Sequence, residues 1–143
     1  MAGDNTVTVE LHDIEGMVFE VDFAGGHEMT LDADEEAGGR NQGPRPMALL
    51  LAGLGGCTGM DVISLLRKMR QPVAAYRVEV TGERAPDHPK VYTHITVRHI
   101  VAGEVNEERL AHAIELSTTR YCSAIAMLGQ AAQITTEYEI LSG

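Results

Sequence analysis

The sequence has few aromatic residues, few basic residues and only two cysteines. Aromatic residues make up 4% of the chain, and tryptophan is absent. Eleven Lys and Arg residues stand against 21 Asp and Glu residues, which gives a formal net charge of −10. Proteins that bind duplex nucleic acid neutralise its phosphates with Lys and Arg. This charge balance therefore argues against a nucleic-acid partner.

The chain also lacks an apolar run long enough to predict a membrane partner. Its longest uncharged stretch covers residues 46–60 and is interrupted by glycines, whereas a spanning helix needs about 20 apolar residues. The amino end, with Gly3, Asp4 and Asn5 before alternating Thr and Val, does not resemble a signal peptide. We therefore expect a reducing cytoplasmic location, where cysteines are more often catalytic or metal-binding than structural.

The order of elements predicts an α+β fold in a single domain covering residues 1–143, a usual domain length. Alternating polar and apolar residues predict strands over residues 6–11, 17–23, 28–32, 76–83, 91–101 and 134–141. Helix start and stop residues predict helices over residues 46–70, 107–117 and 121–128, the last capped by Thr118 or Thr119. Strands, a long helix, a hairpin, two helices and a strand do not form a βαβ repeat.

Two segments next to the first cysteine are unusual. Residues 34–45 contain glycines, proline, acids and arginines without periodicity, which predicts a functional loop. The long helix then carries Gly53, Gly55, Gly56 and Gly59, each of which costs about 1 kcal/mol relative to alanine. Such a cost predicts that another backbone, helix or ligand comes close to the glycines.

The cysteines themselves allow two interpretations. Cys57 lies within the apolar, glycine-rich helix, and Cys122 lies at the start of a short helix, where backbone N–H groups favour an anion. Free cysteine also packs commonly as a small hydrophobe. At this point core packing and a controlled nucleophile both remain open.

No pattern in the sequence predicts a metal or another cofactor. The chain has no C-x-x-C, and neither cysteine has an H-x₃-H pair beside it. His88, His94 and His99 lie on the predicted hairpin, and we expect them to be exposed and solvated. A Cys-His-Asn hydrolase has no local signature here either.

The cysteine motifs carry a resemblance to a known family. Residues 44–62 resemble the first-cysteine helix of the OsmC/Ohr family, the osmotically inducible and organic hydroperoxide resistance proteins. Residues 121–123 resemble the second-cysteine motif of that family, and residues 37–40 resemble a loop of its OsmC-like branch.

The resemblance implies antiparallel sheets packed around a long central helix that carries Cys57, in an intertwined homodimer. It also implies a thiol-dependent peroxidase that reduces organic hydroperoxides to alcohols. Cys57 would be the peroxidatic thiol, oxidised to a sulfenic acid, and Cys122 the resolving thiol that forms a disulfide with it. An external thiol or dithiol would then reduce the pair.

Because burial disfavours a thiolate, we expect a cation near Cys57, and Arg40 and Arg45 in the preceding loop are the candidates. Relatives commonly place a glutamate at the helix start, where this chain has Met47 and Ala48. The acid could instead come from the loop, from Glu35 or Glu36. Asp61 is expected to cap or bridge within the structure and not to act as a base. The alternatives to a peroxidase are a non-catalytic binding module for an apolar or thiol ligand and a thiol redox sensor.

Overall fold

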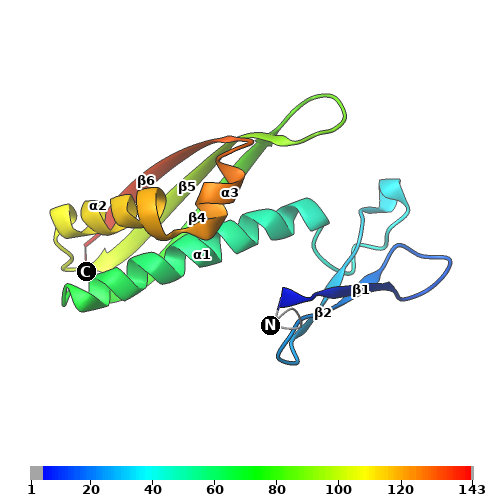
Figure 1. The fold of residues 1–143 in the computed structure, drawn as a ribbon, viewed down its shortest axis with the longest axis horizontal. Coiled ribbons are helices and arrows are strands. Elements are labelled where there is room, and N and C mark those ends of the chain that lie inside the picture. Colours follow the sequence, from blue (N-terminus) through cyan, green and yellow to red (C-terminus); the bar gives the residue numbers. More distant parts are fainter. Residues whose placement is uncertain (1–4, 143) are drawn as a thin grey trace. The chain divides into compact units, whose positions relative to one another are not determined.

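The computed structural model describes residues 5–142, as the ribbon in Figure 1 shows. The chain forms two compact units, one ending at Leu50 and the other beginning at Leu51. A single domain over residues 1–143 therefore stays a prediction. The interpretation of Gly3 and Asp4 as part of a polar amino end falls outside the described residues.

The first unit is a three-stranded antiparallel sheet followed by a loop. Its strands are β1 (Thr8–Leu11), β2 (Phe19–Asp22) and β3 (Glu28–Leu31), in the order β1-β2-β3. All three lie within the segments that the alternating pattern predicts. The predicted loop contains one short 3₁₀ turn, η2 (Glu35–Ala37), whose Ala37 N–H donates to the Asp34 side chain.

The second unit contains most of the long helix α1 (Pro46–Lys68) and a three-stranded sheet (Figure 1). The sheet is built from β4 (Val73–Arg84), β5 (Tyr92–Gly103) and β6 (Gln133–Leu141). Between β5 and β6 come α2 (Glu107–Leu116), η3 (Ser117–Tyr121) and α3 (Ser123–Leu128).

The expected α+β architecture with two sheets and a long helix is confirmed, with one difference in strand direction. The hairpin pair β4–β5 is antiparallel, but β5 and β6 are parallel. The sheet is therefore mixed and not antiparallel throughout. Parallel strands need a long crossover connection, and the segment containing α2 and α3 provides it.

One face of this sheet is covered by helices. Because side chains alternate along a strand, the fully buried residues Ile95, Val97, His99 and Val101 of β5 share that face. Val101 packs in one core cluster with residues of α1 and α2 and the turn before α2: Val62, Leu66, Val105, Leu110, Ala113 and Ile114. The site described below lies on α1 above this face.

Two of the four helix glycines explain how closely α1 approaches the sheet. A Cβ atom on Gly55 would lie 3.0 Å from a methyl group of Val80, and one on Gly59 would lie 3.4 Å from a methyl group of Val78. The glycines in α1 predicted that another backbone, helix or ligand comes close, and the structure shows β4 in this position at Gly55 and Gly59. A Cβ atom on Gly53 or Gly56 would meet nothing within 4 Å in the described chain.

By length and composition alone, α1 is apolar enough to cross a membrane. A single helix of this kind is weak evidence, because the core helix of a water-soluble protein passes the same test. Only 22% of its most apolar window is buried within the described chain, which leaves an apolar surface to be explained.

Candidate functional site

The two cysteines, far apart in the sequence, meet in the second unit. Cys57 and Asp61 lie one turn apart on the same side of α1, and Cys122 immediately precedes α3. The sulfur atoms of Cys57 and Cys122 and a carboxylate oxygen of Asp61 all lie within 4.8 Å of one another. Both thiols are free.

The two thiols differ in their access to solvent. Cys57 is partly exposed, whereas Cys122 is only 3% exposed. Burial, together with the neighbouring Cys57, raises the pKa of the Cys122 thiol to about 11, against the Ile125 N–H, which lowers it. Cys57 is therefore the thiol that a reagent from solvent can reach. Cys122 is a protonated thiol that is shielded from solvent.

Local backbone structure places Cys122. The preceding segment η3 is a π-helical turn, and the Cys122 N–H donates to the Ser117 carbonyl at 2.8 Å. Cys122 then has an extended backbone and caps α3, with its sulfur accepting the Ile125 N–H at 3.4 Å. The sequence predicted Thr118 or Thr119 as the cap of this helix. The structure shows instead that Cys122 itself is the cap. Single π turns in helical segments occur frequently at functional sites.

A directed chain of hydrogen bonds holds the Asp61 carboxylate. The Ser117 hydroxyl donates to Asp61 Oδ2 at 3.0 Å, and a hydroxyl has only one proton to donate. In the 2.7 Å bond between Thr58 and Ser117 the donor is therefore Thr58. Thr58 and Ser117 are fully buried, so the expected bridging role of Asp61 is present in the structure.

A buried histidine beneath α1 was not expected. His99 is fully buried between the sheet and the helices, which corrects the expectation of an exposed side chain. Burial lowers the pKa of His99 to about 4, and burial, followed by the Asp61 charge, raises the pKa of Tyr76. The Tyr76 hydroxyl lies 2.7 Å from Nδ1 of this neutral imidazole, and the two groups share a hydrogen bond.

The second ring nitrogen of His99 lies in the same buried environment. Nε2 has no hydrogen-bond partner among the described residues. The Tyr76 hydroxyl would lie 4.0 Å from a Cβ atom on Gly59, so this pair sits directly under the helix turn that carries Cys57 and Asp61. Sequence spacing alone offered no indication of it, since the pairing depends on strand register.

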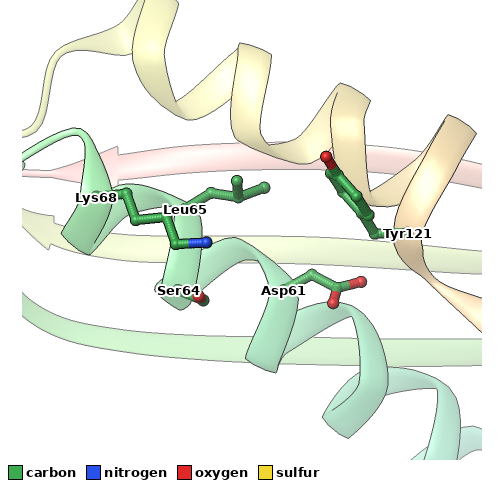
Figure 2. Close-up of a pocket in the computed structure, with 5 residues that line it drawn as sticks. All are labelled: Asp61, Ser64, Leu65, Lys68 and Tyr121. Atoms are coloured by element: carbon green, nitrogen blue, oxygen red, sulfur yellow. The ribbon is translucent and has the colours of Figure 1, made fainter.

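A small pocket of about 200 Å³ opens beside Asp61. It is lined by Asp61, Ser64, Leu65, Lys68 and Tyr121. Figure 2 shows the first four projecting from α1 and the Tyr121 ring coming from the segment between α2 and α3. Tyr121 directly precedes Cys122 in the chain, so the pocket adjoins the thiol pair and contains both a carboxylate and an amine.

The predicted arginines Arg40 and Arg45 belong to the first unit. The loop that carries them is organised by Asp32, which is 2% exposed. Its carboxylate accepts the N–H groups of Gln42 at 3.0 Å, Arg40 at 3.0 Å and Ala33 at 2.7 Å. These backbone bonds, that of Gln42 first, hold the pKa of the Asp32 carboxyl below its usual range.

Arg45 is held in the same unit by its bond to the Gly43 carbonyl at 2.9 Å. It shares a pocket of about 290 Å³ with Glu35 and Glu36, the two acids suggested as substitutes for the missing helix-start glutamate. The action of either arginine on Cys57 stays a prediction from the sequence.

Fold and site together define a small α+β protein with a pair of thiols, one partly exposed on a long helix and one buried at the start of a short helix. Residues 39–137 match the family model of OsmC-like proteins, and the chain belongs to this family. It is 36% identical to protein YhfA of Escherichia coli strain K12 over 130 residues, covering 90% of this chain and 94% of YhfA.

Two solved structures extend the comparison. A hypothetical protein from Aquifex aeolicus VF5 is 32% identical, with a TM-score of 0.84 and 97% of each chain covered. An organic hydroperoxide resistance protein OsmC from Legionella pneumophila is 12% identical, with a TM-score of 0.69 and coverage of 94% of this chain and 96% of that one. The second likeness shows a shared fold.

Proposed function

We propose that this protein is a thiol-dependent peroxidase that reduces organic hydroperoxides to alcohols. The observation that carries the proposal is the pair of free thiols within 4.8 Å of each other, one partly exposed and the other buried. Membership of the OsmC-like family supports a redox or peroxide-related function in general. The Legionella protein of the same fold is described as an organic hydroperoxide resistance protein and predicted redox protein.

Each thiol has one role in the proposed reaction. The Cys57 thiolate attacks one peroxide oxygen, the O–O bond breaks, and the alkoxide leaves as the alcohol after taking up a proton. Cys57 is then a sulfenic acid. The Cys122 sulfur displaces its oxygen as water, which forms the Cys57–Cys122 disulfide. An external thiol or dithiol reduces the disulfide by exchange.

Arg45 and Arg40 supply the positive charge that favours the Cys57 thiolate in this proposal. Glu35 or Glu36, which share a pocket with Arg45, hold the guanidinium in place. We propose that the protein acts in the cytoplasm as a homodimer. Nucleic acid and membrane are not among its proposed partners.

The proposal is tested by intact-mass analysis of the reduced protein after one equivalent of cumene hydroperoxide. The wild type should lose about 2 Da as two thiols become a disulfide, and Cys122→Ser should instead gain about 16 Da as a sulfenic acid. Cys57→Ser should consume no peroxide above the rate of the buffer. Ser123→Ala, next to Cys122 but outside the thiol cluster, is the matched control and should behave as the wild type. Unchanged peroxide consumption by Cys57→Ser would refute the mechanism.

A second candidate function is that of a non-catalytic binding module. One observation favours it: the first unit has an almost entirely apolar pocket of about 350 Å³, lined by Val9, Met17, Phe19, Leu31, Asp32, Ala33 and Pro46. In that case both thiols stay titratable after peroxide, and an apolar ligand raises the melting temperature. A thiol redox sensor, the third alternative, would be oxidised fast but recycled poorly by small thiols.

A further inference from the structure

The thiol cluster contains more than a peroxidase needs. Besides the two sulfurs it includes the Asp61 carboxylate, so three groups that become negative on ionisation lie within 4.8 Å of one another. Among residues 51–142, no Lys, Arg or His nitrogen forms a salt bridge with Asp61. The three donor atoms are therefore close enough together for one metal ion to take all of them as ligands.

We propose that the reduced protein binds one Zn²⁺ per chain through Cys57, Asp61 and Cys122. Zinc bonds to sulfur at about 2.3 Å and to carboxylate oxygen at about 2.0–2.2 Å in tetrahedral geometry, which separates neighbouring donors by about 3.6–3.8 Å. The donors here lie within 4.8 Å, so side-chain rotations that move them together by about 1 Å or less complete the site. Two thiolates select Zn²⁺ over the hard cations Mg²⁺ and Ca²⁺.

The surroundings of Asp61 support a metal ligand. Ligating carboxylates are usually oriented by a second layer of hydrogen bonds, and here Thr58 donates to Ser117, which donates to Asp61. Both hydroxyl residues of this hydrogen-bond chain, Thr58 and Ser117, are fully buried. The hydrogen bonds therefore orient the Asp61 carboxylate in the metal-free protein. Three protein ligands leave a fourth position open, as in catalytic zinc sites, and the pocket beside Asp61 has room for a water or a small ligand.

Local sequence spacing could not reveal this site. Zinc motifs are recognised by cysteines or histidines close together in the chain, whereas here Cys57 and Asp61 come from α1 and Cys122 from a distant segment. The proposal is independent of hydroperoxide chemistry, because it concerns the reduced protein in the absence of any peroxide. Either one can fail while the other holds.

The test is a titration of the reduced, metal-stripped protein with Zn²⁺ against a chromophoric chelator. We expect one Zn²⁺ per chain. Cys57→Ser, Cys122→Ser and Asp61→Asn should each weaken binding by more than about 100-fold, and Ser117→Ala by about 10-fold, as for a residue that orients a ligand. His112→Ala, which removes an exposed imidazole on α2, is the control and should leave the affinity unchanged.

Two further measurements do not depend on the folding of a variant. Co²⁺ in place of Zn²⁺ should give a thiolate-to-metal charge-transfer band and the intense visible absorption of a tetrahedral ion. Saturating Zn²⁺, but not Mg²⁺, should slow the alkylation of both cysteines in the wild type at least tenfold. The absence of one-to-one binding by the wild type would overturn the proposal. So would Zn²⁺ binding that persists unchanged in Cys122→Ser.

Discussion

The buried surroundings of His99 determine the charge state of its imidazole. The imidazole is fully buried against the sheet and shares a hydrogen bond with the Tyr76 hydroxyl at Nδ1, while Nε2 has no partner among the described residues. Protonating it would put a charge into the core without a partner, and such a charge costs far more than a neutral donor does. The residue therefore ties the stability of the second unit to pH.

We predict a loss of stability in acid that depends on His99. Burial lowers its folded pKa to about 4 from the usual histidine value of 6.5, so between these values the unfolded chain binds more protons than the folded one. The free energy of unfolding therefore falls as the pH drops from about 6.5 to about 4, by about 2–3 kcal/mol. Urea unfolding of wild type and His99→Asn at pH 7.5 and 4.5 should give the steeper loss in the wild type.

The control for this experiment is His112→Asn, which changes an exposed imidazole on α2. It should lose as much stability between the two pH values as the wild type does. Equal pH dependence in wild type and His99→Asn would show that His99 is not the titrating group.

At the scale of single residues, the sequence predicted the site only in part. The presence of two special cysteines could be recognised from their motifs, and Asp61 was expected to bridge. The burial of His99 could not be predicted, because a histidine in an alternating strand is compatible with either face until the helices are placed. The same holds for Ser117, whose role depends on a π turn that no local pattern indicates.

The elements followed from the sequence more closely than their pairing did. Every predicted strand and helix is present within a few residues of its expected ends, because alternation, caps and prolines act locally. Strand direction is not local. The parallel β5–β6 pair arises because α2 and α3 carry the chain back across one face before β6 begins, which allows a parallel return.

At the element scale, the packing of the β4–β5 hairpin leaves no room for a side chain at Gly82. A Cβ atom there would lie 2.5 Å from two ring atoms of Tyr92 and 3.3 Å from Leu51 of α1. The ring cannot bend away, so Gly82→Ala forces a shift of the strand or of the buried Tyr92. We expect the free energy of unfolding to fall by about 1–3 kcal/mol, as for overpacked cores, measured by urea denaturation.

The neighbouring exposed position provides the control for the hairpin. Thr81→Ala removes atoms on the solvent side of β4 and should change the stability by about 0.5 kcal/mol or less. If Gly82→Ala is as stable as Thr81→Ala, the close approach of the Tyr92 ring to β4 is not a packing constraint.

At the scale of the whole molecule, the second unit leaves an apolar surface without a partner in the described chain. Met60 of α1 is 73% exposed and Met127 of α3 is 76% exposed. Gly53 and Gly56 show bare backbone with nothing within 4 Å of an added Cβ atom. Large exposed apolar side chains on one part of a protein often mark an interaction surface, and helix glycines are costly unless something packs against them.

We therefore predict a homodimer that buries this side of α1. Sedimentation equilibrium at micromolar concentration should give twice the mass of 15.4 kDa. Met60→Glu should shift the equilibrium to monomers, because it would bury an unpaired charge at the seam. Glu108→Lys, an exposed charge change on α2, should leave the dimer intact. A folded wild-type monomer would contradict the prediction. So would a Met60→Glu dimer of undiminished stability, since the side of α1 that carries Met60 would then lie outside the dimer interface.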